Sequence, residues 1–346
     1  MHILPKKLYV ESITRSDECF ERFYFHILLQ NMMAGTVDAE KVEIVLRNPE
    51  LGSTLRQTFE GRLLQELFLQ SQPFIDKADE AGPAIHPLKK RGIVDHHLEV
   101  KGHLRFSEVE CHFAGRDSNG NPVVGATRRE LCRDKPSTVL TLPVRGRWWV
   151  AGGHSSLEPH SRSYLPALTY AYDFVQIGQG TKSYRNDGAR NSDYFCYGED
   201  VLAAADGEVV VATDGVEENL PSKTPADAPE CYQSPASIPM PGNHVVIKHA
   251  EGEYTFYAHL QPRIRVRVGQ KVRRYQLLGR VGNSGESTEP HLHFHLADGV
   301  SLNASNGMPI AFSNWLEDAF SISPGRVEEG IMLSREIIAS AEDNDG

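Results

Sequence analysis

Three histidines occupy alternate positions within residues 290–295, as His291, His293 and His295. Side chains of a β-strand alternate between its two faces, so on a strand these three imidazoles would share one face. Neutral imidazole is a good ligand for zinc. The spacing alone leaves two interpretations open, a metal site on a strand and a polar strand face at the surface.

Two other residues have side chains that suit such a site. Asp173 is a lone carboxylate in the apolar, strand-like run of residues 169–175, and burying an unpaired carboxylate is costly unless a metal binds it. His259 ends a second strand-like run, residues 254–259, in which aromatic residues precede it. Taken alone, the first would be a turn carboxylate and the second a capped strand end. Together with the alternating histidines they favour a site.

Five segments with familiar patterns follow one another along the chain. They are residues 201–210 (VLAAADGEVV), 242–249 (GNHVVIKH), 257–260 (YAHL), 268–272 (VGQKV) and 282–294, which runs from Gly-Asn-Ser-Gly to Pro-His-Leu-His-Phe. In this order they resemble the lysostaphin-type (LytM-like) zinc endopeptidases, peptidoglycan hydrolases with the duplicated hybrid motif that cut peptide bonds in the bacterial wall. The resemblance covers roughly residues 145 to 312.

The resemblance implies a role for each of these side chains. Asp173 and His293 would be zinc ligands, and His259 and His291 would transfer protons and stabilise the oxyanion. A histidine upstream of Asp173 would be the third protein ligand, with water in the fourth position. Zinc would lower the pKa of that water to about 7, which makes hydrolysis possible at neutral pH. The implied substrate is peptidoglycan or another peptide.

The sequence departs from the family pattern at one ligand. Four residues before Asp173, where the family has histidine, stands Thr169. The ligand must then come from further upstream, from His160 or His154. We favour His160, which is closer and follows a proline. His295 stands where many relatives have glutamate, and we expect it beyond the metal ligands as a hydrogen-bond partner.

The predicted fold is all-β. Short alternating runs separated by polar turns predict a β-sandwich-like accessory domain over residues 1–138, with a β-bulge at residues 107–108 and a possible short helix at residues 57–70. An antiparallel β-sheet peptidase domain would follow over residues 139–315. Residues 316–346 would form a helical or disordered tail, with a helix through Ile331, Leu333 and Ile338.

Two loop-rich inserts interrupt the predicted peptidase domain, at residues 178–198 and 214–242. Long loops in a compact domain are often functional, so the second insert would wall the cleft and limit substrate length. No chemistry is visible in the accessory domain, whose exposed face would bind wall polymer, a partner or the catalytic cleft.

The composition excludes several other classes of protein. The formal net charge is -10 over 346 residues, and no Lys/Arg block is present, so nucleic-acid binding is not expected. No apolar run approaches the about 20 residues of a membrane span. Residues 1–15 are charged and lack an apolar segment, which predicts no signal peptide, so the location relative to an envelope substrate stays open.

The five cysteines show no C-x-x-C spacing, which argues against a zinc–thiolate site. We expect free thiols, with a Cys196–Cys231 bridge as the lesser alternative.

Two other functions compete with the peptidase. A non-catalytic binding module would keep the fold and lose ligands, and Thr169 is the main support for it. A cupin-like metal oxygenase also uses His-x-His but needs an acid about four residues later, where this chain has Ala297 followed by Asp298 in a turn-like pair. Replacing His259 would cripple a peptidase and matter little to a cupin.

Overall fold

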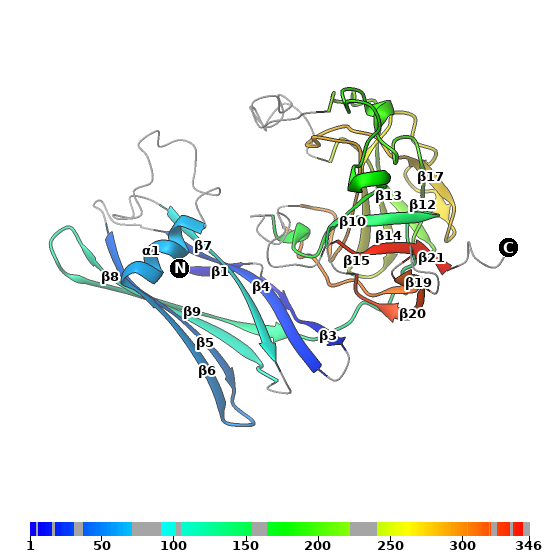
Figure 1. Ribbon diagram of the computed structural model, residues 1–346. Coiled ribbons are helices and arrows are strands. Elements are labelled where there is room, and N and C mark those ends of the chain that lie inside the picture. Colours follow the sequence, from blue (N-terminus) through cyan, green and yellow to red (C-terminus); the bar gives the residue numbers. More distant parts are fainter. Residues whose placement is uncertain are drawn as a thin grey trace. The chain divides into compact units, whose positions relative to one another are not determined.

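The computed structural model describes residues 1–4, 6–15, 18–30, 37–70, 91–101, 105–153, 165–221, 241–302, 304–317, 319, 324–332 and 335–341. The chain divides into two compact units, Met1–Asp134 and Lys135–Gly346 (Figure 1). Strands dominate both units, and the part described contains a single α-helix, α1 (Gly61–Gln70). The predicted all-β class is confirmed. No described helix has the length and apolar character needed to cross a membrane.

The first unit contains two sheets that share one apolar core. The strands of the first sheet are β1 (His2–Leu4), β3 (Glu11–Arg15), β4 (Glu18–Gln30) and β7 (Arg91–Lys101), with β4 paired to the other three. The second sheet has the order β2 (Leu8–Tyr9), β9 (Pro122–Cys132), β8 (Glu108–Asp117), β5 (Val37–Asn48) and β6 (Ser53–Glu60). Phe23 and Phe25 of β4 lie in the same buried cluster as Val42, Ile44 and Val109 of the second sheet. This is the predicted β-sandwich-like arrangement.

Of two local predictions for this unit, the short helix is confirmed over Gly61–Gln70 and the β-bulge was wrong. Residues 57–60 belong to β6, and the helix begins only at Gly61. The predicted bulge at residues 107–108 is absent, because Ser107 precedes β8 and donates its N–H to the carbonyl of Arg47. The register shift of this strand pair lies in β5 instead, between Ala39 and Lys41.

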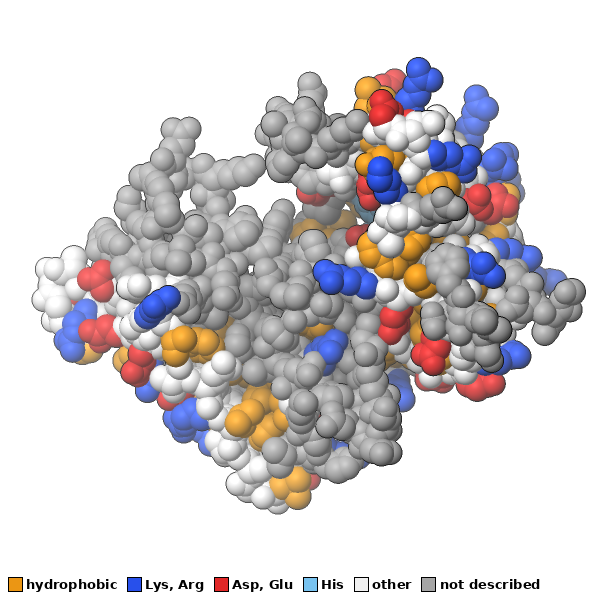
Figure 2. Space-filling view, viewed as in Figure 1, with side chains coloured by type: hydrophobic (Ala, Val, Ile, Leu, Met, Phe, Trp, Pro, Cys, Tyr) orange, Lys and Arg blue, Asp and Glu red, His pale blue; other side chains and the backbone are white. Residues whose placement is uncertain are grey.

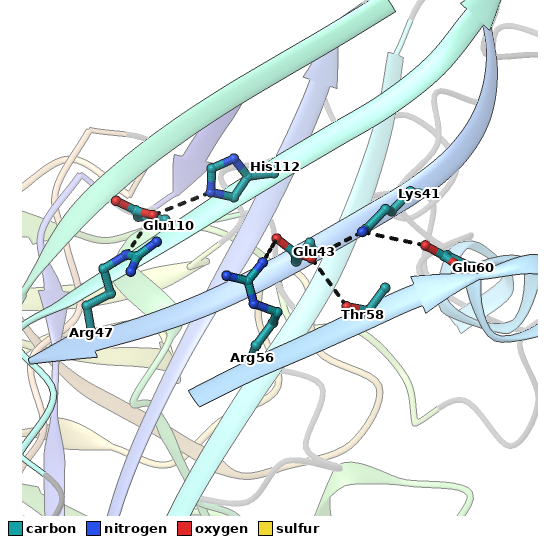
Figure 3. Close-up of polar contacts among 8 residues, drawn as sticks. All are labelled: Lys41, Glu43, Arg47, Arg56, Thr58, Glu60, Glu110 and His112. Atoms are coloured by element: carbon teal, nitrogen blue, oxygen red, sulfur yellow. Dashed lines mark hydrogen bonds and ion pairs between the residues drawn. The ribbon is translucent and has the colours of Figure 1, made fainter. Parts of the chain in front are cut away.

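Charged side chains link neighbouring strands on the polar face of the second sheet (Figure 3). Glu43 of β5 accepts a hydrogen bond from Arg56 of β6 at 2.5 Å and pairs with Lys41 at 3.2 Å. Arg47 of β5 pairs with Glu110 of β8 at 3.0 Å. The Arg56 guanidinium lowers the pKa of Glu43 below its ordinary value, despite the opposing effect of burial. Such half-exposed pairs each contribute about 0.2–1 kcal/mol, so they adjust the sheet rather than hold it together.

The second unit is built on one long sheet, which has ten strands among the described residues. Its strand order is β16 (Lys271–Val272), β13 (Gly207–Thr213), β14 (Asn243–Ala250), β15 (Glu253–Leu260), β18 (Leu292–Ala297), β11 (Tyr172–Val175), β10 (Arg147–Gly152), β21 (Ile337–Ser340), β19 (Phe312–Glu317) and β20 (Gly325–Gly330). A separate pair joins β12 (Asp200–Leu202) to β17 (Leu277–Arg280). All pairings within the long sheet are antiparallel, as predicted.

The middle of this sheet has an aromatic core on one face. Tyr172, Phe174 and Phe294 are fully buried and contact Phe312 edge-on or tilted at centroid distances of 5.3 to 6.3 Å. Since strand residues alternate, residues 173 and 293 point to the opposite face. The apolar positions of β11 and β18 therefore fix which of their residues face the site.

The predicted helical tail was also wrong. Residues 337–340 form β21, in which Ile338 is fully buried opposite Trp148 of β10. The predicted boundary at residue 315 falls inside β19, which pairs with both β20 and β21. An open edge of β10 offers this segment both hydrogen-bond partners and burial, and that tertiary gain overrides a weak helical periodicity. Leu333 lies outside the described residues.

A short linker enters the second unit and is held by one carboxylate. Glu253, at the start of β15 and 7% exposed, accepts hydrogen bonds from the backbone N–H and the hydroxyl of both Ser137 and Thr138. Burial raises the pKa of Glu253, but the hydrogen bonds from Thr138 and Ser137 outweigh it and leave that pKa below its ordinary value. The linker is thus anchored by the ionised form.

Candidate active site

Asp173 and His293 lie opposite each other on paired strands. The register of β11 and β18 places their Cα atoms in the same pair, and Asp173 Oδ1 is 3.1 Å from His293 Nδ1. His291, just before β18, brings its Nε2 to 3.5 Å from the same oxygen. The side chain of Asp173 keeps 22% exposure and that of His291 14%. A carboxylate and two imidazoles therefore converge where solvent still has access.

His259 joins them from the end of β15. Its ring centroid lies 4.8 Å from that of His291 and 5.7 Å from that of His293. Its backbone is in the left-handed conformation, with φ of 61°, which residues other than glycine rarely adopt. Its backbone N–H donates a hydrogen bond to the carbonyl of Pro241, and its own carbonyl accepts one from the N–H of Gly282. These two hydrogen bonds hold that conformation. Strain of this kind, of order 1–3 kcal/mol, persists only where the surroundings enforce it.

Main-chain carbonyls set the tautomer of both His259 and His291. His259 Nδ1 lies 2.9 Å from the carbonyl oxygen of Ser284, and His291 Nδ1 lies 2.8 Å from that of Glu289. A carbonyl only accepts, so each Nδ1 carries the proton and each neutral ring has its lone pair on Nε2. Burial lowers the pKa of His259 well below its ordinary value, and the nearby imidazoles of His291 and His293 lower it further. The buried ring is therefore neutral near pH 7.

His295 contacts the far side of His293. Its Nδ1 lies 3.0 Å from His293 Nε2, and its ring stacks on Phe256 at a centroid distance of 4.2 Å. It is 2% exposed, so almost all of it is buried. As expected from its position in the sequence, it is a hydrogen-bond partner of His293, and a partner on the second ring nitrogen fixes how the first one points.

Two loops hold the turn that carries both carbonyls. The amide nitrogen of Asn219 donates to the carbonyls of Gly285 and Ser287, at 2.7 and 3.1 Å. Asn283 donates through its amide to Asn191 at 3.0 Å. Residues 178–198 and 214–221 thus fasten the turn at residues 282–290. Residues 222–240 of the second predicted insert lie outside the described part.

Two glycines leave room that the site needs. Gly242 has φ of 60°, and a Cβ there would overlap the carbonyl group of Ser284, which orients His259. A Cβ at Gly152 would come within 3.0 Å of Asp173 Oδ2. Neither position tolerates a side chain without moving a residue of the site.

The donors brought together suit zinc in type. A carboxylate oxygen and an imidazole nitrogen that face each other are typical zinc ligands. Within the described residues, however, no group of three His, Cys, Asp or Glu side chains forms a metal site. The predicted third ligand, His160, and its alternative His154 lie in residues 154–164, outside the described part. Thr169 is 4% exposed and its hydroxyl donates to the carbonyl of Pro166 at 2.9 Å.

The contacts of Asp298 bear on the cupin-like alternative, and those of Cys196 bear on the predicted disulfide alternative. Asp298 is the only acid near the position that a cupin would use, and it accepts hydrogen bonds from the backbone and amide of Asn306 at 2.7 and 2.6 Å.

Cys196 is a free thiol that donates to the carbonyl of Pro290 at 3.1 Å, so it forms no bridge. Cys111 and Cys132 are also free, whereas Cys231 lies outside the described residues.

Sequence reasoning missed the residues that hold the histidines. Ser284 and Glu289 act through main-chain carbonyls, which residue type does not reveal. Asn219 lies in the second insert, which was expected to wall the cleft, but its sequence does not mark this side chain as one that holds the turn. The one available signal was Gly242, since a glycine directly before a strand often marks a close backbone approach.

The comparison with known families decides the identity of this region. The family model "Peptidase family M23" matches residues 191–310. This chain contains a peptidase family M23 domain. The matched part of the M23 domain includes His259, His291 and His293, whereas Asp173 lies before it.

Curated relatives of the M23 domain include two proteins of Vibrio cholerae. The peptidoglycan DD-endopeptidase ShyA is 40% identical over 100 residues, which are 28% of this chain and 23% of ShyA. The peptidoglycan DD-endopeptidase ShyB is 43% identical over 194 residues, which are 54% of this chain and 39% of ShyB. The chain thus spans well under half the length of these relatives.

A solved structure similar to this chain is the catalytic domain of the antimicrobial peptidase lysostaphin from Staphylococcus simulans. It is 19% identical, with 47% of this chain and 88% of that one covered, at a TM-score of 0.27.

Proposed function

We propose that this chain is a zinc-dependent endopeptidase that hydrolyses peptide bonds in peptidoglycan cross-links. The observation that carries the proposal is the convergence of Asp173, His259, His291 and His293 from three neighbouring strands and the turn before one of them. The M23 match and the two DD-endopeptidase relatives support the substrate class.

Asp173 and His293 would hold the zinc, with a histidine from residues 154–164, His160 in our proposal, as the third ligand. Bound zinc would act as a Lewis acid toward water and the scissile carbonyl. His295 orients His293 through the ring nitrogen that faces away from Asp173. The buried aromatic face beneath β11 and β18 keeps these side chains in place.

His259 and His291 would handle the protons of the reaction. Hydrolysis removes one proton from water and delivers one to the leaving amine. Each neutral ring has its lone pair on Nε2, so either would accept the water proton at that atom, and the protonated ring would then have an N–H to donate to the oxyanion or the amine. Because burial disfavours the charged form of His259, a proton accepted by that ring is readily passed on.

The test is mass-spectrometric analysis of purified peptidoglycan digested with the full chain. We expect new muropeptide ends that identify the bond, lost with a chelator and restored by zinc. The His259→Gln variant should bind zinc and release fragments on the order of 100-fold or more slowly. A chain that binds zinc and cuts no wall peptide would overturn the enzymatic proposal and leave a binding module. A chain that cuts equally well with the chelator would overturn the role of the metal.

A further inference from the structure

A basic segment of the second unit plays no part in the site. Residues 263–280 contain seven Lys and Arg residues and no Asp or Glu, in a chain whose formal net charge is -10. The seven are Arg263, Arg265, Arg267, Lys271, Arg273, Arg274 and Arg280. Since other residues separate most of them, they form no uninterrupted block in the sequence.

The fold presents all seven cations to solvent. Each of them is exposed, whereas Val266 and Val272 between them are 8% and 3% exposed. Arg265 donates its backbone N–H to Leu278 of β17 at 2.8 Å, and β16 pairs with β13, so ordered backbone carries the charges. Figure 2 shows Lys and Arg side chains gathered over the side of the second unit where β12 and β17 lie in Figure 1. We call residues 263–280 the basic surface.

Nearby carboxylates neutralise only part of this charge. Asp200 pairs with Arg280 at 3.5 Å. Asp206 and Asp214 bind backbone N–H groups of the basic surface, and Glu208 lies opposite Lys271 in the strand register. Among the described residues, these contacts place four carboxylates beside the seven cations, and only Asp200 forms an ion pair with one of them.

Most of the cationic heads have no ion-pair partner among the residues that the structure describes. No carboxylate of the described residues forms an ion pair with the side chains of Arg263, Arg265, Arg267, Lys271, Arg273 or Arg274. Charges that a fold leaves unpaired on one side are available to an external anion.

An apolar residue lies among the cations at the tip of a turn. Val268 is 61% exposed, and the following Gly269 has φ of 80° and turns the chain. Arg267 and Lys271 flank this turn. Exposed apolar side chains beside cations are the combination that binds at a lipid head-group boundary.

We propose that the basic surface binds a phospholipid bilayer with anionic head groups, with Val268 entering the head-group layer. A single-stranded nucleic acid or other stacking polymer would need exposed aromatic rings. The one ring of this surface, Tyr275, is half-buried with the guanidinium of Arg145 over it at 5.9 Å. Binding of this kind is independent of the hydrolytic activity and of bound zinc.

The experiment is co-sedimentation of the full chain with vesicles of phosphatidylcholine alone or mixed with phosphatidylglycerol. We expect binding only to the anionic vesicles, reversed by high salt. The triple variant Arg265→Gln, Arg267→Gln, Arg273→Gln should bind roughly 100-fold more weakly, since each cation near an anionic membrane contributes about 1 kcal/mol. Val268→Asp should weaken binding without removing any cation. The matched control, Arg105→Gln with Arg128→Gln and Lys135→Gln, also removes three exposed cations and should bind as the unaltered chain does.

Three results would overturn the proposal. They are equal binding to neutral and anionic vesicles, unchanged binding by the triple variant, and binding to a soluble polyanion such as heparin without binding to vesicles. The last result would assign the basic surface to an anionic polymer instead. Circular dichroism of each variant verifies that the strands are intact.

Discussion

Asp173 Oδ1 and His293 Nδ1 lie 3.1 Å apart across the paired strands β11 and β18. The contact joins residues 120 positions apart in the sequence. A neutral imidazole and a carboxylate at this distance share a proton in the absence of a metal, and both present lone pairs when a cation replaces that proton. Substitutions should therefore distinguish the proposed zinc ligands from the proposed proton-transfer residues.

Asp173→Ala and His293→Ala should each abolish the binding of zinc, because each removes a proposed ligand. His259→Gln and His291→Ala should retain about one zinc per chain and lose on the order of 100-fold or more in activity. Metal content by inductively coupled plasma mass spectrometry, measured beside muropeptide release, distinguishes the two groups. His112→Gln in the first unit is the control for loss of an imidazole. Zinc retained by the His293→Ala variant would show that the ligand assignment is wrong.

Gly242→Ala should impair the reaction while leaving zinc bound. The added Cβ overlaps the carbonyl group of Ser284, so the acceptor for His259 Nδ1 must shift. We expect a loss of at least about tenfold in kcat, which corresponds to one hydrogen bond of roughly 1.4 kcal/mol. Gly252→Ala is the matched control, since Gly252 also has positive φ, at 72°, but nothing lies within 4 Å of its Cβ. Equal losses in the two variants would attribute the effect to backbone strain alone.

Asn219→Ala should lower kcat with little effect on zinc content. The change removes two hydrogen bonds that hold the turn at residues 282–290, each contributing about 1 kcal/mol. Asn219→Asp should be worse, because a carboxylate would then face two carbonyl oxygens. Asn186→Ala is the control, because its amide bonds Asp193 within its own loop at 2.9 Å. Steady-state kinetics on a soluble cross-linked muropeptide provide the measurement, and identical kcat values for the Asn219→Ala and Asn186→Ala variants would refute this role.

The Glu253 anchor should make stability depend on pH in the acid range. Its pKa is lower in the folded chain than its ordinary value near 4.5, so its contribution is complete above that value and is lost as pH falls through the folded pKa. Urea unfolding from pH 6 down to pH 3 should therefore show a decline that Glu253→Gln reduces. The Glu251→Gln variant, which alters an exposed neighbour paired with Lys248, provides the comparison. A Glu253→Gln profile that falls as steeply as that of the unaltered chain would contradict the linkage.

The sequence predicted those parts of the fold and site that depend on residue type and period. The alternation of His291, Leu292 and His293 matches the two faces of β18 and its entry, and the apolar runs around Asp173 and His259 are strands. The C-terminal strands could not be found this way, because Ile338 packs in β21 only through pairing with β10. Such pairing depends on residues almost two hundred positions away, which local periodicity does not contain.

The residues that orient the histidines of the site could not be predicted from the sequence, for a related reason. Ser284 and Glu289 contribute carbonyl oxygens that every residue has, so no pattern of side chains marks them. The left-handed backbone of His259 is likewise imposed by Pro241 and Gly282 across the fold. The residue types proposed for the site could be read from the sequence, whereas the orientation of their side chains depends on tertiary contacts.

The Glu253 anchor also determines where the chain can be divided. Its four hydrogen-bond donors come from Ser137 and Thr138, which follow the division between the units at Asp134 and Lys135. A second unit expressed alone from Lys135 would keep all four donors, whereas one that begins at Val139 would leave a buried carboxylate with none of them. A few residues of linker would then separate a stable fragment of the second unit from an unstable one, although the sheet itself is the same in both.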